Sequence, residues 1–152
     1  MINVLHVIDS LGVGGAERQL ALTLSALDPQ RVRSFVCYLH SPDDVEPAIR
    51  DLGIPVYRLD AEGKSQWHRA VLRLRRLVKS LDIDLIHTQL FDADVVGGLV
   101  GRITAVPVVS TLANSSYDSA WLIDNPSLSR FKLAYVCITY VIKRYLSTFI
   151  NY

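Results

Sequence analysis

The sequence INVLHVIDSLGVGGAERQLALTLSAL, residues 2–27, contains the order of elements that decides the fold. Its first seven residues form a short apolar run rich in β-branched side chains, which predicts a buried strand. From Ala16 onward, apolar side chains recur at the spacing of one helix face, and Asp28-Pro29 ends that pattern. Glycines lie between the two patterns. The stretch therefore predicts a strand that turns through a glycine-rich loop into a helix.

The same alternation continues along the chain. Further strands are predicted at 32–40, 54–59, 84–88, 106–112 and 147–152, and further helices at 43–53, 67–81, 92–105 and 130–146. Strands that alternate with helices predict an α/β fold, a doubly wound, Rossmann-like parallel sheet with helices on both faces. No linker, repeat or low-complexity tract interrupts the pattern, so residues 1–152 are predicted to form one domain.

Composition excludes several classes of protein. Half of the 152 residues are hydrophobic and a fifth are charged, which excludes a disordered chain. Sixteen basic residues nearly balance fifteen acidic ones, so a nucleic-acid partner is not expected. Cys37 and Cys137 lack metal-ligand spacing and are expected to be buried thiols. The N-terminus lacks a basic leader and the longest uncharged apolar run, 133–142, is too short to span a bilayer, so a cytoplasmic protein is expected.

The glycine loop has two interpretations. Glycines stand at 12, 14 and 15, but Glu17 occupies the place of the third glycine in a dinucleotide fingerprint, and a P-loop lysine is absent. A helix N-terminus that follows a glycine loop can bind an anion through its backbone amides. The alternative is a tight strand-to-helix turn, with Glu17 as a partner of the helix dipole. Both remain open at this stage.

Topology indicates where a ligand would bind. In open parallel sheets, ligands lie beyond the carboxyl ends of the strands, where the strand order reverses. With the usual order this point lies between the first and fourth strands, so the loops at 9–15, 87–92 and 111–117 are expected to meet there. His87 is either a site residue or a locally bonded strand-end histidine, and Asp92 is either a ligand group or a helix N-cap. His6 lies mid-strand and is expected in the core.

Three stretches together resemble the family 4 glycosyltransferases, which have the two-domain GT-B fold. These are GVGGAERQL (12–20), DIDLIHTQLFDADVVGGLVGRITAVPVVSTLAN (82–114) and STFINY (147–152). The resemblance covers nearly the whole chain. It implies that the chain is the N-terminal, acceptor-side domain, the N-terminal half of a GT-B fold. The intact enzyme would transfer a sugar from a nucleotide-sugar to a glycan, a lipid-linked acceptor or a small hydroxylated acceptor.

The resemblance also implies roles for particular residues. Backbone amides of Gly14 and Gly15 would approach the diphosphate of the donor. The acceptor cleft would include His87, Gln89, Asn114, Ser115 and Ser116. No metal and no cofactor are implied, because the nucleotide-sugar is a co-substrate and no metal-ligand cluster is seen. The catalytic residue is not identified: Ala113 stands where many family members have a histidine.

The resemblance leaves the partners open. The donor-binding half of the family has no counterpart here, so the chain alone is expected to be inactive. Apolar side chains recur at helical spacing from Phe131 to Phe149, and they are expected either in the core or at an interface with that second domain or another copy of the chain. Peripheral contact with the inner face of the membrane would use the basic residues at helical spacing, Arg69, Arg73, Arg76 and Lys79. The alternative function is a non-catalytic Rossmann-like binding module. Coding sequence beyond Tyr152 would favour the enzyme.

Overall fold

A six-stranded parallel sheet forms the centre of the computed structural model, which describes residues 1–111 and 149–151. The strand order is β3-β2-β1-β4-β5-β6 and every neighbouring pair is parallel. The strands are β1 (Ile2–Ile8), β2 (Val32–Tyr38), β3 (Val56–Arg58), β4 (Leu85–Gln89), β5 (Val108–Thr111) and β6 (Phe149–Asn151). The predicted α/β class and the reversal of strand order between β1 and β4 are both confirmed.

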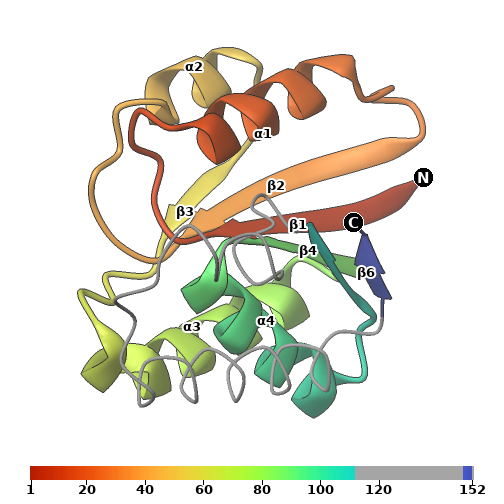
Figure 1. Cartoon of the computed structure of the whole chain (residues 1–152). Helices are drawn as coiled ribbons and strands as arrows, with labels where there is room; N and C mark the ends of the chain where they lie inside the picture. Colours follow the sequence, from red (N-terminus) through yellow and green to blue (C-terminus); the bar gives the residue numbers. More distant parts are fainter. Residues whose placement is uncertain (112–148, 152) are drawn as a thin grey trace, which may run out of the picture.

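Helices cover both faces of the sheet, as the sequence predicts (Figure 1). One face carries α1 (Gly15–Ala26) and α2 (Glu46–Asp51), and the other carries α3 (Trp67–Ser80) and α4 (Phe91–Thr104), with a short 3-10 helix, η1 (Lys64–Gln66), before α3. Alternate side chains of β1 separate into two cores: Leu5 and Val7 pack towards α3 and α4, whereas Ile8 packs with Leu20 and Leu24 of α1. Side chains at even and odd strand positions therefore face different helices.

Two glycines allow α4 to lie directly on the sheet. A Cβ atom at Gly97 would stand 2.5 Å from Cγ2 of Thr88, and one at Gly101 would stand 2.2 Å from Cγ2 of Val108. Both distances are far below van der Waals contact, so only glycine permits this separation of helix and sheet. Helix α4 thus packs against the sheet next to the carboxyl end of β4, where the sequence predicts a site.

Element boundaries differ from the predictions by a few residues. The helix predicted at 43–53 is limited to 46–51, because residues before it form a turn in which the Val45 amide bonds to the Leu11 carbonyl (2.8 Å). The strand predicted at 54–59 is limited to 56–58. Gly53 takes a positive φ of 76° after α2, a left-handed conformation that favours glycine at the end of a helix. Cys37 is a buried free thiol, while Cys137 and the helix predicted at 130–146 lie outside the described residues.

Within 1–111 and 149–151, no helix is long and apolar enough to cross a bilayer. In the same ranges, no group of three or more His, Cys, Asp or Glu side chains is arranged to hold a metal ion.

Candidate functional site at the carboxyl ends of β1 and β4

The loops that follow β1 and β4 meet where the strand order reverses. Asp9, the first residue after β1, accepts hydrogen bonds from the backbone amides of Ala93 (2.6 Å) and Asp92 (3.3 Å). The carboxylate thus caps the N-terminus of α4 from a different strand. Asp92 lies inside the first turn of α4, so the interpretation of Asp92 as the N-cap is wrong. The cap comes from a residue 83 positions earlier, which local sequence spacing does not reveal.

Burial makes Asp9 an unusual acid. Desolvation raises the pKa of Asp9 to about 7, with a further rise from the nearby charges of Asp92 and Asp94, while the two amide donors lower it. The connection from β4 into this helix also passes through Leu90, whose φ of 72° is strained for a residue with a side chain. Strain and a perturbed carboxyl group at a strand end are typical of functional sites.

The loop after β2 supports the beginning of the glycine loop. The Leu11 amide donates to the Pro42 carbonyl (2.9 Å), and a Cβ at Gly12 would lie 2.5 Å from Cγ of Pro42. Gly12 is therefore required by the close approach of Pro42 and not by a ligand. The backbone of residues 9–12 is held between β1 and this neighbouring loop.

Gly14 is also explained by a contact within the chain. A Cβ at Gly14 would lie 2.2 Å from Oε2 of Glu17, whose residue is only 8% exposed. The Glu17 carboxylate folds back against the N-cap position of α1, where it lies near the positive end of the helix dipole. The dipole-partner interpretation of Glu17 thus fits the structure, and a bound anion at this end of α1 would have to displace that carboxylate.

Gly15 differs from its neighbours because its surroundings are open. Among the described residues, apart from its own chain neighbours and the backbone of α1, no heavy atom lies within 4 Å of the Cβ that could be added there, and the residue is exposed. It is the first residue of α1, where amide groups have no carbonyl partner one turn back. Within the described residues, the backbone at Gly15 is therefore open to a ligand, with the Glu17 carboxylate beside the neighbouring Gly14.

A double-mutant cycle tests the contact between Gly14 and Glu17. Gly14→Ala is expected to lower the free energy of unfolding by about 1 kcal/mol more in the natural chain than in a Glu17→Ala background, since the added methyl meets only the carboxylate. The cost of losing glycine at the N-cap is the same in both backgrounds and cancels. Urea unfolding of the four chains measures the coupling, and a coupling near zero would contradict the contact.

His87 belongs to a polar chain that crosses three strands. Its Nδ1 atom lies 2.9 Å from Nδ1 of His6 in β1, and its Nε2 atom lies 2.8 Å from Oγ1 of Thr111 in β5. The two imidazole rings meet edge to face, with centroids 5.1 Å apart. Both ring nitrogens of His87 are thus engaged inside the protein. Burial lowers the pKa of His87 and lowers that of His6 to about 3, so both rings are neutral at pH 7.

Within the described part of the chain, two buried polar atoms of this face have no hydrogen-bond partner. They are Nε2 of His6, whose residue is 4% exposed, and Oε1 of Gln89, whose residue is 3% exposed. Gln89 pairs in register with Ile8 and with Thr111, so it lies on the same sheet face as the His6–His87–Thr111 chain. Buried polar atoms without partners are uncommon, and at a strand end they indicate a place for a ligand or an ordered water.

Sequence reasoning missed two members of this group. His6 is in the core, as expected, but it bonds to His87 and is not an isolated core histidine. A histidine inside the apolar run INVLHVI was the available signal, because the strand alternation places it on the face opposite Leu5. Thr111 was predicted only as part of the site loop at 111–117. Asp94 lies on the other face of the sheet, where its carboxylate accepts hydrogen bonds from the hydroxyls of Thr88 (2.5 Å) and Ser110.

The sequence of residues 14–147 matches the family model described as glycosyl transferase 4-like domain. This match covers most of the chain. The chain belongs to the glycosyl transferase 4-like domain family. The resemblance drawn from the glycine loop and the fourth and fifth strands is confirmed. No curated protein resembles the chain closely enough to count as a relative.

Solved structures share the fold of this glycosyl transferase 4-like domain. MurG from Acinetobacter baumannii has a TM-score of 0.69 at 16% identity, over 99% of this chain and 40% of MurG. HepE from Anabaena, solved in complex with UDP, has a TM-score of 0.69 at 18% identity, over 98% of this chain and 37% of HepE. A UDP-GlcNAc 2-epimerase from Neisseria meningitidis has a TM-score of 0.62 at 14% identity, over 96% of this chain and 39% of that enzyme. The chain thus spans about two fifths of these structures.

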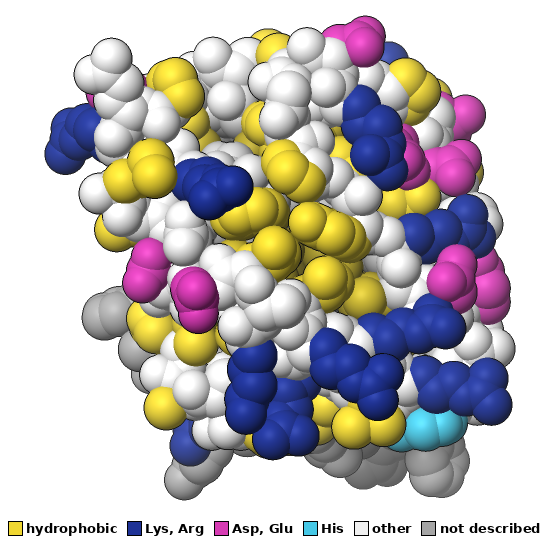
Figure 2. Space-filling view, turned by 180° about the vertical axis from the view of Figure 1, so that it is seen from behind, with side chains coloured by type: hydrophobic (Ala, Val, Ile, Leu, Met, Phe, Trp, Pro, Cys, Tyr) yellow, Lys and Arg dark blue, Asp and Glu magenta, His cyan; other side chains and the backbone are white. Residues whose placement is uncertain are grey.

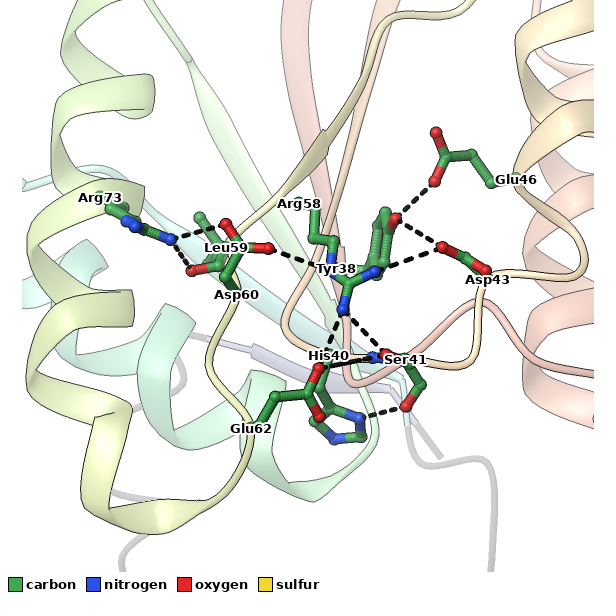
Figure 3. Close-up of polar contacts among 10 residues, drawn as sticks. All are labelled: Tyr38, His40, Ser41, Asp43, Glu46, Arg58, Leu59, Asp60, Glu62 and Arg73. Carbon is green, nitrogen blue, oxygen red and sulfur yellow. Dashed lines mark hydrogen bonds and ion pairs between the residues drawn. The ribbon is translucent and has the colours of Figure 1, made fainter.

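Polar contacts around Arg58 hold the loop between β2 and α2 in place (Figure 3). This is the loop that contacts the glycine loop of this glycosyl transferase 4-like domain. The guanidinium of Arg58 contacts Asp43 (3.4 Å), Glu62 (2.9 Å) and the Ser41 hydroxyl (2.8 Å). The buried Tyr38 hydroxyl donates to Glu46 (2.5 Å), at the start of α2. These contacts hold residues 41–46, and with them Pro42, against the glycine loop.

The remaining predicted site residues of the domain lie outside the described part of the chain. They are Ala113, Asn114, Ser115 and Ser116. Of the predicted residues that are described, Gly14, Gly15, His87 and Gln89 all lie at or near the carboxyl end of the sheet, on α1, on β4 or in the loop between β1 and α1.

Proposed function

We propose that this chain forms the acceptor side of a glycosyltransferase that takes a sugar from a nucleotide-sugar. The observation that carries the proposal is the open backbone at Gly15, at the same end of the sheet as a partly unsatisfied polar group from β1, β4 and β5. Family membership supports glycosyl transfer in general. The complex of HepE with UDP supports a nucleotide as one of the ligands.

In this proposal, the N-terminus of α1 stabilises the leaving diphosphate. Amides at Gly14 and Gly15 donate to phosphate oxygens as negative charge develops on them, which is electrostatic catalysis by preorganised donors. The Glu17 carboxylate leaves the helix end when the diphosphate binds, because two anions cannot share the same amides. Neither a metal nor a cofactor is part of the proposed chemistry, and the nucleotide-sugar is the co-substrate.

The acceptor is proposed to bind over the polar face that contains His87 and Gln89. Asn114, Ser115 and Ser116 are proposed to add hydroxyl and amide groups from the loop after β5. Such groups suit a glycan, a lipid-linked or a small hydroxylated acceptor. The alternative, a non-catalytic binding module, is favoured by one observation: Glu17 already occupies the helix end that a diphosphate would need.

A substitution at Gly15 tests the proposed function. In a protein that joins this chain to a donor-binding half, Gly15→Val is expected to reduce kcat/KM for the nucleotide-sugar by about 100-fold or more, because the side chain blocks the backbone donors. Open space around Gly15 should leave the fold intact, as circular dichroism would show. Val13→Ala, at an exposed side chain of the same loop, is the matched control and should change little. Equal loss in both variants, or in neither, would contradict the role of Gly15.

The chain by itself is expected to be inactive and to bind nucleotide-sugars only at millimolar concentration or weaker. Each amide hydrogen bond contributes about 0.5–1.5 kcal/mol, whereas immobilising a ligand costs about 4 kcal/mol or more. Titration calorimetry with a panel of nucleotide-sugars measures this affinity. Micromolar binding would show that the chain already contains a complete donor site, against the assignment as the acceptor side.

Peripheral membrane contact is proposed for the exposed face of α3. Of the predicted basic residues, Arg69, Arg76 and Lys79 are exposed on this helix, whereas Arg73 pairs with Asp60 (2.9 Å). The exposed Arg75 joins the same face, and Leu72 is 51% exposed between these residues. Figure 2 shows Lys and Arg side chains gathered in the lower part of the rear face, on the side that carries α3 and α4. Such a face attracts anionic headgroups at about 1 kcal/mol per basic residue.

Sedimentation with vesicles tests this contact. Binding to vesicles that contain anionic lipid is expected to weaken about tenfold or more in Arg75→Gln/Arg76→Gln, and to disappear with neutral lipid or at high salt. Arg18→Gln/Arg31→Gln, which removes two exposed arginines on α1 and in the turn that follows it, is the matched control, because α1 lies on the other face of the sheet from α3. If the two double variants bind alike, α3 is not the contact.

A further inference from the structure

The burial of His6 determines which partner donates in each of the two hydrogen bonds of His87. Two neutral arrangements satisfy the 2.9 Å contact with His6 and the 2.8 Å contact with Thr111. In one, His6 donates from Nδ1 to His87, and His87 donates from Nε2 to the Thr111 hydroxyl. In the other, every bond is reversed, and Thr111 donates to His87.

The two arrangements differ at Nε2 of His6. This atom is buried and has no hydrogen-bond partner, so it is either a bare lone pair or an N–H group without an acceptor. Buried N–H groups without an acceptor are the rarer defect in folded proteins. The first arrangement leaves only the lone pair unsatisfied. It also leaves the hydrogen of the Thr111 hydroxyl outside the chain of bonds, directed to whatever binds at the end of β5.

Gln89 presents the opposite chemistry beside Thr111. The two residues are register partners on β4 and β5, and Oε1 of Gln89 is a buried acceptor without a donor. A donor from Thr111 and an acceptor from Gln89 thus lie next to each other on one sheet face. A single group satisfies the two together if it both accepts and donates. A sugar hydroxyl, like the water molecule that it would displace, does so, whereas a fully ionised oxyanion only accepts.

We propose that His6 is a positioning residue that sets the direction of the His6–His87–Thr111 relay, so that Thr111 and Gln89 together bind one hydroxyl group of the ligand. That this ligand is the sugar acceptor rests on the function proposed above. The relay itself does not depend on that function. Reversal of the relay would present two acceptors and would select an amine instead of a hydroxyl.

Nitrogen NMR of the histidine rings tests the direction. In 15N-labelled chain carrying His40→Gln and His68→Gln, only His6 and His87 give ring signals, and His6→Asn identifies those of His87. At neutral pH the expected pattern is a proton on Nδ1 of His6 and on Nε2 of His87. The reverse pattern, or rapid exchange between the two, overturns the proposal. Should the double variant not fold, the single variants His40→Gln and His68→Gln give the same assignment.

A titration of the same labelled chain tests the hydroxyl selection. Methyl glucoside at up to hundreds of millimolar is expected to shift the side-chain amide of Gln89, whereas sulfate, which only accepts hydrogen bonds at neutral pH, is not. Thr111→Val should weaken this response about tenfold and Thr111→Ser should restore it, since one hydrogen bond is lost and regained. A response to sulfate alone, no response to the glucoside, or an unchanged response in Thr111→Val overturns the hydroxyl site. Failure of sugar transfer with these results intact would count against the proposed enzyme and not against the relay.

Discussion

Gly101→Ala is expected to lower the free energy of unfolding by about 2 kcal/mol, even though alanine is the better helix former. The added Cβ would lie 2.2 Å from Cγ2 of Val108 and 2.9 Å from the backbone carbonyl oxygen of Val106. The carbonyl belongs to the turn that leads into β5 and cannot move without displacing the strand. The helix must therefore move away from the sheet, which opens the core around Val100.

Gly15→Ala is the matched control, because both glycines are in helices but only Gly101 lies against the sheet. Nothing lies within 4 Å of a Cβ at Gly15, so its free energy of unfolding should change by no more than about 0.5 kcal/mol. Urea unfolding followed by far-ultraviolet circular dichroism measures both variants. Equal stability of the two would show that α4 is not held at the close distance described above.

Acid is expected to destabilise the chain through His6, by up to roughly 4 kcal/mol as the pH falls from about 6.5 to about 3. Burial, followed by the charge of His87, lowers the pKa of His6 to about 3 in the folded state, from 6.5 in the unfolded chain. Between these values the unfolded chain binds a proton that the folded chain does not. Stability is therefore complete above pH 6.5 and is lost as the pH decreases.

Asp9 acts in the opposite direction, so the effect of His6 must be measured as a difference. The pKa of Asp9 is raised to about 7 by burial, and the folded chain holds a proton that the unfolded chain releases between pH 3.8 and 7. His6→Asn removes the titrating ring but keeps a polar atom near Nδ1, and it leaves Asp9 unchanged. The stability advantage of the natural chain over His6→Asn should decrease steadily below pH 6.5. Parallel curves for the two chains would show that His6 does not remain neutral in the folded state.

The periodic patterns were sufficient to predict the order of elements. Apolar runs of strand length alternate with helical periodicity, and the right-handed βαβ rule then leaves few ways to arrange them. The family resemblance was readable for the same reason, because its motifs are local stretches such as GVGGAERQL. Boundaries failed where a distant residue decided them: the β2–α2 turn is held by Leu11, so α2 begins at Glu46 and not at Asp43.

The sequence by itself determined the sheet, the two helical layers and the end of the sheet where a site lies. Only the tertiary structure decided what each site residue contacts. The three glycines look alike in sequence, but their surroundings differ. A Cβ at Gly12 would clash with Pro42 and one at Gly14 with Glu17, whereas one at Gly15 would lie in open space. Likewise, His6 and His87 are 81 positions apart, and their bond exists because β1 and β4 are neighbours in register. Periodicity records which face a side chain occupies, whereas its partner is set by strand order and register, which bring together residues remote in the chain.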